Sequence, residues 1–144
     1  MSPNLTQRRL RAWLRLLRVT RRTENHLREY LRVNHATTLP RFDVMAALYR
    51  ASTPMTMSAL SGELLVSNGN ATAVVQRLEA EGLARRTPHD RDGRVVMVSL
   101  TDEGKTAFEQ QATGHRIEVD KLLAGLDAEA LDTLREMIHR IEGD

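Results

Sequence analysis

Cysteine is absent from this 144-residue sequence, which excludes disulfide bridges, thiolate metal sites and thiol-based redox sensing. No window approaches the roughly 18 apolar residues that a membrane-spanning helix needs. The N-terminus reaches a run of arginines with no apolar stretch behind it, unlike a signal peptide. With 41% apolar residues, the chain can build the core of one compact domain. We therefore expect a soluble cytoplasmic protein without a membrane partner.

Catalytic motifs are also missing. The sequence has no G-x-S-x-G motif, no Walker-type phosphate loop and no cysteine nucleophile, so we predict that the protein is not an enzyme and needs no cofactor. Its five histidines lack the H-x-x-x-H and H-E-x-x-H spacings of helical zinc sites. Ligands could still converge from separate helices, for example His35 and His115, but no metal site is expected.

The net charge of +2 is unevenly distributed. Residues 1–35 hold nine arginines and two acidic residues, a net charge of +7, whereas residues 36–99 carry +1 and residues 100–144 carry −6. A basic N-terminal segment and an acidic C-terminal segment can attract each other, within a chain or between chains. Alternatively, both are solvated helix faces. The predominance of arginine suits phosphate or carboxylate binding but does not by itself establish a nucleic-acid partner.

Residues 6–35 contain neither glycine nor proline and carry leucine at three- and four-residue spacings. This pattern predicts one amphipathic helix that Thr6 caps and that ends before Pro40. A helix of about 30 residues spans about 45 Å, which is long for so small a domain. We therefore expect its apolar stripe to pack against a second subunit. The stripe consists of Leu10, Leu14, Leu17, Leu27 and Leu31.

Three shorter helices are expected next, over residues 40–50, from Thr56 or Ser58 to about residue 65, and over residues 70–81. Residues 66–69 form the turn between the last two, and Gly82 stops the third helix. The expected apolar face of the first helix consists of Phe42, Met45 and Tyr49, widened by Val44 and Leu48, and the inward residues of the other two are Leu60, Leu64, Val74, Val75 and Leu78.

The periodicity then changes. Residues 83–87 and 94–100 surround a segment rich in turn-forming residues, which predicts a β-hairpin. Thr101 caps a helix that runs to about residue 123, and a last helix opens at residue 126 with Leu131, Leu134, Ile138 and Ile141 on one stripe. The order predicts a mainly α protein with a small β-hairpin wing. We expect a winged helix-turn-helix lobe over residues 37–100 and a helical dimerisation region over residues 1–36 and 101–144.

The third short helix begins with residues suited to DNA. In a helix-turn-helix, the N-terminal residues of the second helix lie at base edges in the major groove. Asn can pair with adenine, the methyl groups of Ala and Thr can contact thymine, and first-turn N–H groups can bind phosphate. The same residue types are also ordinary turn and cap residues. The candidates are Ser67, Asn68, Asn70, Ala71 and Thr72.

The hairpin tip provides a second candidate contact. Arg91 and Arg94 flank Asp92, and an arginine on a projecting turn can enter a narrow minor groove. Asp92 could position Arg94 through a charge-assisted hydrogen bond. The alternative is a solvated turn with a local ion pair. The position of the hairpin directly after a helix-turn-helix pattern favours a DNA contact.

Three blocks of the sequence resemble the signature of the MarR family. Residues 77–86 match R-L-E-x-x-G-L-x-x-R, residues 92–94 match D-x-R, and residues 100–104 match L-T-x-x-G. The resemblance covers about residues 8–142. It implies a homodimer with one winged helix-turn-helix lobe per subunit and interlaced termini.

The resemblance also assigns roles to individual residues. It implies a recognition helix over residues 67–78, with Arg77 near phosphate or in a local ion pair. It places Arg94 in the minor groove with Asp92 as its partner. One departure is Ala73, where many members carry Arg or Lys, so we expect one contact fewer and a narrower footprint.

Members of this family often bind small aromatic acids between the dimer region and the DNA lobe. The resemblance therefore implies an effector pocket, in which an arginine or histidine meets a carboxylate. Trp13, the only tryptophan, has plain core or dimer packing as its alternative role. The candidate pocket residues are Trp13, Arg15, His35, Arg41 and Phe42.

Together these observations predict a transcription regulator, expected to be a repressor. It would bind a near-palindromic site in double-stranded DNA as a homodimer and be released by a small anionic aromatic effector. The alternative is a winged-helix adaptor that binds a protein and not DNA. The nearly balanced charge of residues 36–99 is compatible with that alternative.

Overall fold

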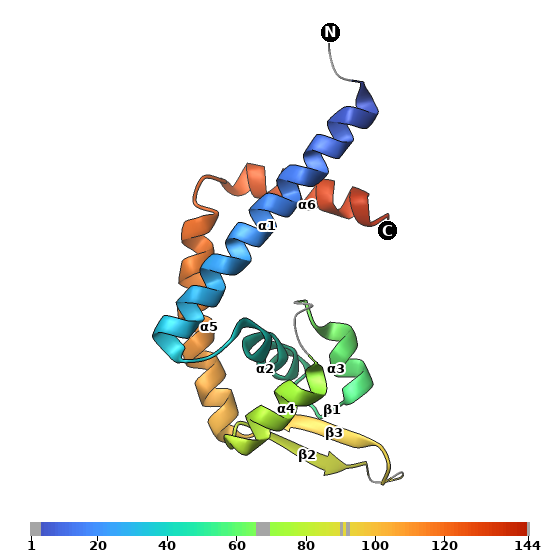
Figure 1. Cartoon of the computed structure of the whole chain (residues 1–144), viewed down its shortest axis with the longest axis vertical. Coiled ribbons are helices and arrows are strands. Elements are labelled where there is room, and N and C mark those ends of the chain that lie inside the picture. Colours follow the sequence, from blue (N-terminus) through green and yellow to red (C-terminus); the bar gives the residue numbers. More distant parts are fainter. Residues whose placement is uncertain (1–3, 66–69, 90, 92, 144) are drawn as a thin grey trace.

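The computed structural model describes residues 4–65, 70–89, 91 and 93–143. Six helices and three strands lie within these residues, in a mainly α fold with a small β wing (Figure 1). The predicted fold class is therefore confirmed. The elements are α1 (Leu5–His35), α2 (Leu39–Ala51), β1 (Met55–Thr56), α3 (Met57–Glu63), α4 (Ala71–Ala80), β2 (Ala84–Pro88), β3 (Val96–Leu100), α5 (Asp102–Leu122) and α6 (Ala128–Glu142).

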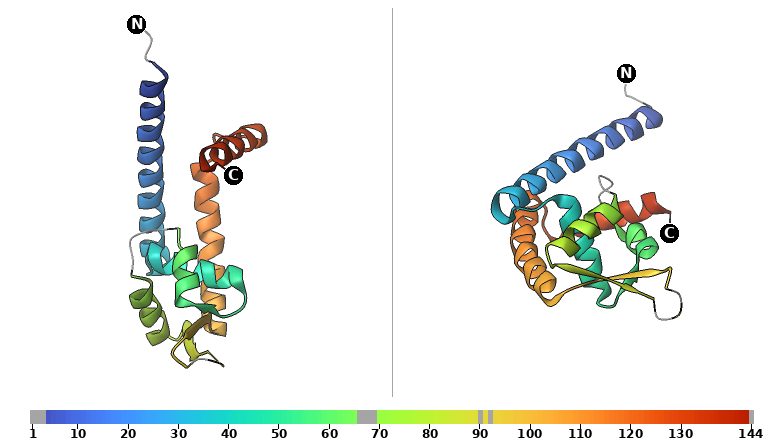
Figure 2. Two further views of the ribbon diagram at one scale, coloured as in Figure 1. Left: turned by 90° about the vertical axis from the view of Figure 1, so that its right-hand side faces the viewer. Right: turned by 60° about the horizontal axis from the view of Figure 1, so that its bottom comes forward.

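The elements from α2 to β3 gather into a lobe, and α1, α5 and α6 extend away from it (Figures 1 and 2). The core of the lobe lies where α2, α4 and β3 meet, and it includes Met45, Val75 and Val98. Leu31 of α1 and Phe108 of α5 belong to the same buried cluster. The lobe and the nearer ends of the two long helices therefore share one core.

The three strands form one antiparallel sheet in the order β1-β3-β2. The β2–β3 pair is the predicted hairpin, with Ala84 opposite Leu100, although its strands begin one and two residues later than expected. The sequence did not predict β1, in which Met55 pairs with Val98. A two-residue strand is too short to produce an alternating pattern, so periodicity could not detect it.

Side-chain caps define where most helices begin. The prediction that Thr6 caps α1 is wrong, because Asn4 is the cap: its Oδ1 accepts a 2.8 Å hydrogen bond from the Gln7 N–H, and the Gln7 side chain reaches back to the Asn4 N–H. This reciprocal capping box satisfies two backbone donors that would otherwise have no partner. Thr101 caps α5 as predicted. Asp127 caps α6, which therefore starts two residues later than expected.

Helix α2 is buried on nearly every side, which corrects the single apolar face that was predicted. Residues 42–48 are all buried, whereas Tyr49, expected on the inner face, is exposed. The reason is position: α1, α3, α4, α5 and β3 all pack against α2. A helix surrounded by other elements does not need one polar face, so an amphipathic pattern could not describe it.

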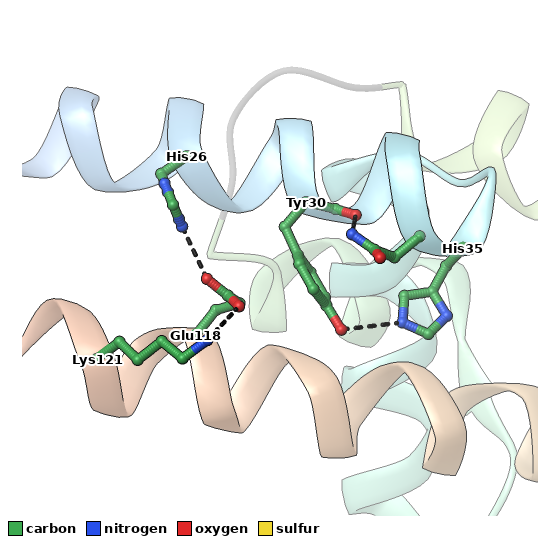
Figure 3. A network of polar contacts seen from close by, with 6 residues as sticks. His26, Tyr30, His35, Glu118 and Lys121 are labelled. Carbon is green, nitrogen blue, oxygen red and sulfur yellow. Dashed lines mark hydrogen bonds and ion pairs between the residues drawn. The ribbon is translucent and has the colours of Figure 1, made fainter.

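Helices α1 and α5 lie side by side and make polar contacts (Figure 3). His26 Nε2 lies 2.9 Å from Glu118 Oε2, and Lys121 Nζ lies 3.4 Å from Glu118 Oε1. These hydrogen bonds, with that of His26 the stronger cause, hold the pKa of Glu118 below its usual value. Nearer the lobe, a Cβ at Gly114 would collide with the Tyr30 hydroxyl. Gly114 therefore permits the close approach of the two helices.

The outer ends of the long helices carry exposed apolar side chains. Helix α6 has no buried residue, and the first half of α1 exposes Leu10, Trp13 and Leu14. None of the helices in the described part of the chain is both long and apolar enough to cross a bilayer.

Candidate nucleic-acid interface

Helix α4 presents its first turn to solvent. Asn70, immediately before it, is the cap: its Oδ1 accepts hydrogen bonds from the N–H groups of Thr72 (3.0 Å) and Ala73 (3.4 Å). The side-chain oxygen is therefore occupied, while the amide nitrogen can still donate. Thr72 is exposed, but Ala71 is buried against the lobe. Thr72 is therefore a candidate for contact with a base, whereas Ala71 is a packing residue.

Gln76 is a candidate that the sequence analysis missed. It is exposed and lies four residues after Thr72, so both side chains lie on the same helix face. Its amide can pair with adenine in the way that Asn does. Arg77, on the neighbouring position, is also exposed and pairs with Glu81 across 3.8 Å. The four-residue spacing between Thr72 and Gln76 was the signal that could have identified Gln76.

Two ion pairs brace α4 against its neighbours. Glu81, at its C-terminal end, pairs with Arg41 of α2 as well as with Arg77. Glu79 accepts hydrogen bonds from Arg86 Nε (3.1 Å) and Nη2 (2.9 Å), which joins α4 to β2. The Arg86 hydrogen bonds lower the pKa of Glu79, and burial lowers the pKa of Arg41. The orientation of α4 is therefore fixed by contacts on both sides.

The backbone after α3 is also anchored, at Leu65. Asp43, buried within α2, accepts a 2.7 Å hydrogen bond from the Leu65 N–H through its Oδ2. Leu65 is the last described residue before the segment 66–69. The candidates Ser67 and Asn68 lie in that segment and so are outside the described residues. Asp43 was not singled out in the sequence, because a lone acidic residue in an apolar helix has no distinguishing pattern.

The wing carries exposed arginines at its tip. Arg91 and Arg94 are both exposed, and the Arg91 N–H donates to His89 Nδ1 across 3.1 Å. The His89 N–H in turn donates to the Val95 carbonyl across 2.8 Å, which extends the β2–β3 pairing into the turn. Asp92, the expected partner of Arg94, lies outside the described residues. The hairpin thus presents two cations at the end farthest from α5 (Figure 1).

Comparison with known proteins identifies the family. Residues 37–95 match the MarR family. The HTH-type transcriptional regulator MhqR of Bacillus subtilis is 24% identical over 95% of this chain and 93% of its own length. The regulator PecS of Dickeya dadantii is 31% identical over 70% of this chain, an alignment that spans 62% of PecS.

Solved structures agree. A MarR family transcriptional regulator from Silicibacter pomeroyi superposes with a TM-score of 0.80 at 28% identity, covering 97% of both chains. A mutant MarR from E. coli complexed with operator DNA has a TM-score of 0.80 at 25% identity, over 96% of this chain and 99% of that one. The chain belongs to the MarR family. It is a DNA-binding transcription regulator with a winged helix-turn-helix, not an enzyme.

The structure gives two MarR signature blocks a physical role. In the first block, Glu79 and Arg86 form the ion pair between α4 and the wing. In the last block, Thr101 Oγ1 donates to the Gly82 carbonyl across 2.7 Å and accepts from the Gly104 N–H across 3.0 Å. A Cβ at Gly104 would collide with the Leu83 carbonyl. These residues therefore hold α5 against the base of the wing.

The candidate effector residues do not converge within one chain. Trp13 and His35 lie on the same helix, separated by about 33 Å at 1.5 Å per residue. Phe42 is buried and stacks on His115 with ring centroids 4.5 Å apart. Arg41 is held by Glu81, and His35 Nε2 lies 3.4 Å from the Tyr30 hydroxyl (Figure 3).

The histidines likewise do not form a metal centre within the described residues, which contain no group of three or more His, Cys, Asp or Glu placed to hold a metal ion. His115 packs on an aromatic ring, and its burial lowers its pKa. This environment favours the neutral ring as a packing residue.

Proposed function

We propose that this MarR-family regulator binds a specific, near-palindromic duplex as a homodimer. The observation that carries the proposal is the exposed α4 face of Thr72 and Gln76, with the cap Asn70 at its start, in a lobe whose wing also exposes Arg91 and Arg94. In this arrangement α4 enters the major groove and the wing reaches the adjacent minor groove. Two lobes would read half-sites about 10–11 base pairs apart.

Further proposed contacts divide by role. Arg77 lies beside the reading face and can reach phosphate while Glu81 restrains it. Ser67, Asn68 and Asp92 stay proposed DNA contacts from their place in the sequence. Ala71, being buried, is proposed to support the helix rather than to touch a base. Phosphate contacts would position the protein, and contacts to base edges would supply specificity.

The proposed dimerisation region is residues 1–36 and 101–144, with residues 37–100 as the DNA-binding lobe. Large apolar side chains on α1, α5 and α6 are exposed, and apolar patches of this kind mark protein interfaces. A second copy that covers them would complete the packing that one chain leaves open. The exposed residues are Leu5, Leu10, Trp13, Leu14, Leu16, Val19, Val33, Ile117, Leu122, Leu123, Leu131, Met137, Ile138 and Ile141.

We also propose that the protein acts as a repressor, since occupancy of a promoter by a dimer excludes other proteins, and that it works in the cytoplasm, where its DNA target is. A small anionic aromatic effector would release it by binding one lobe spacing better than the other. Because Trp13 and Arg15 are far from the lobe end of α1 in one chain, this pocket would require the dimer. Arg41 would have to leave Glu81 to meet an effector.

The test is selection from a pool of random duplexes at two salt concentrations, with the wild type and two variants. Arg94→Ala removes one of the two wing cations. Gln76→Ala removes a side-chain amide and leaves the cap of α4 unchanged. Both should weaken binding to the selected duplex by about 1–3 kcal/mol for a specific contact. Arg135→Ala, an exposed arginine on α6, is the matched control and should bind as the wild type does.

Enrichment of a symmetric site would support the proposal. Failure to enrich any duplex, with Arg94→Ala indistinguishable from Arg135→Ala, would sink it and favour the protein-binding adaptor. The effector proposal has its own assay: salicylate and related phenolic acids are added to the protein–duplex complex while release and thermal stability are followed. No release and no thermal shift with any of them would contradict it.

A further inference from the structure

The first half of α1 carries a row of arginines on one face. Five of them alternate at three- and four-residue spacings, so they lie above one another along the helix. All five are exposed, and the row spans about 21 Å at 1.5 Å per residue. We call it the arginine stripe, and it consists of Arg8, Arg11, Arg15, Arg18 and Arg22.

The stripe lacks neutralising partners. Helix α1 has no acidic residue before Glu24, and no ion pair joins any side chain of the stripe to another residue in the described part of the chain. Farther along the same helix, Arg32 pairs with Glu29 across 2.6 Å. Five adjacent like charges raise one another's energy. A row of this kind is stabilised by an anionic partner, which the described residues of this chain do not supply.

The direction of the stripe separates it from the apolar face. At 3.6 residues per turn, its mean direction lies about 120–180° around the helix from Leu10, Trp13, Leu17, Leu27 and Leu31, and about 80° from Leu14. Leu27 and Leu31 are the residues that α1 buries against the lobe. A second copy that covers Trp13 and Leu17 would therefore leave the arginines facing solvent.

The acidic C-terminal helix does not provide the partner either. In α6, Glu129, Asp132 and Glu136 share one face, about 170° away from the mean direction of Leu134 and Ile138 by the same helical geometry. If the apolar faces of α1 and α6 meet between two copies, both charged faces point outward. Asp132 is also already paired with Arg135.

We propose that the arginine stripe is a second, sequence-independent binding site for the phosphate backbone of duplex DNA. Arginine forms bidentate pairs with phosphate, and duplex DNA presents a dense row of phosphate charges. The first half of α1 points away from α4 and the wing (Figures 1 and 2). A duplex on the stripe is therefore a different segment from the one read by the lobe, and the protein bridges two segments.

This inference goes beyond the proposed function, because the stripe needs no operator. The test captures wild-type protein on beads that carry the selected duplex and then adds a fluorescent 40-base-pair duplex of unrelated sequence. The stripe variant is R8Q/R11Q/R18Q. It keeps good helix formers and leaves Arg15, the candidate effector residue in the stripe, unchanged. The control is R116Q/R135Q/R140Q, which removes the same charge from exposed positions of α5 and α6.

We expect the wild type, the control and R8K/R11K/R18K to retain the second duplex on the beads. The stripe variant should retain at least ten-fold less of it. For the stripe variant, the slope of log affinity against log salt for the second duplex should become less negative by about 2.7, because three phosphate contacts are lost. Capture on the selected duplex should be equal for all four proteins. Arg94→Ala should show the reverse pattern, with weakened capture and unchanged binding of the unrelated duplex in solution.

Several results would overturn the inference. One is a wild type that retains no second duplex, and another is a stripe variant that retains as much as the control. A stripe variant that elutes as a monomer would place the arginines in the subunit interface instead. Stripe-dependent binding to phosphatidylglycerol vesicles but not to duplex DNA would assign the stripe to a membrane surface. Helicity measured by circular dichroism ensures that the variants are compared as folded proteins.

Discussion

The two halves of α1 differ in what they pack against. Leu31, in the second half, has no exposed surface, whereas Leu10, in the first half, is 57% exposed. The residues come from one helix with one leucine pattern, so the sequence does not distinguish them. Among the described residues, the second half of α1 is therefore covered by the winged-helix lobe of its own chain, whereas we propose that a second copy covers the first half. The predictions below test that contrast, beginning with the largest expected effect.

The strongest test substitutes the same residue type in both halves of the helix. Leu31→Ala leaves a cavity in the core and should lower the free energy of unfolding by about 2–5 kcal/mol. Leu10→Ala should change the stability of the chain by less than about 0.5 kcal/mol but weaken self-association. Urea unfolding and sedimentation over a range of protein concentrations measure the two effects. Equal losses of unfolding free energy would mean that the halves do not differ.

A glycine pair tests how tightly the lobe holds α5. In Gly104→Ala the new Cβ meets the Leu83 carbonyl, so the substitution should destabilise the protein by about 1–3 kcal/mol. Gly62→Ala, in α3, has open space around its Cβ and should be neutral or stabilise by up to about 1 kcal/mol. Thermal unfolding measures the stability of both variants. A harmless Gly104→Ala would show that α5 is not anchored there.

The capping role of Asn70 can be separated from its proposed DNA contact. Asn70→Ala removes the acceptor for two N–H groups and should cost about 0.5–2 kcal/mol of stability. Asn70→Ser keeps a cap oxygen and should be nearly as stable as the wild type, yet it lacks the amide that can donate to a base. Stability and affinity for the selected duplex are measured together. If Asn70→Ser binds as tightly as the wild type, Asn70 is only a cap.

The smallest expected effect concerns the ion pair between α4 and the wing. Because Arg86 lowers the pKa of Glu79 in the folded protein, the pair adds stability above the unfolded pKa and loses it as the pH falls through the folded pKa. Glu79→Gln should therefore lower the unfolding temperature slightly at pH 7 and not at acidic pH. The exposed Glu63 provides the control, Glu63→Gln. A Glu79→Gln effect that persists in acid would contradict the ionic role.

The sequence predicted what local patterns encode. Helix periodicity, the turn-rich hairpin and the cap Thr101 indicated the winged helix-turn-helix order, with element boundaries that differ from the observed ones by up to two residues. It could not predict β1, which exists only because Met55 and Thr56 pair with β3, or the burial of α2 on all sides. Both features depend on neighbours that are distant in the sequence.

The candidate site shows the same division. The spacing at the start of α4 indicated a DNA-reading helix, but it did not distinguish the buried Ala71 from the exposed Gln76. The effector residues were grouped by the family resemblance, and helix geometry places Trp13 about 33 Å from His35 within one chain. Such assignments require the orientation of side chains, which a residue pattern alone does not contain.

The central claim is that one chain builds a complete reading lobe but that two chains are needed to bind the operator. Native mass spectrometry of the protein on its selected duplex tests this directly. The account predicts two chains per symmetric duplex, with Leu10→Ala requiring higher protein concentrations to reach that state. A stable complex of one chain per duplex that binds as tightly as the complex of two chains would contradict it.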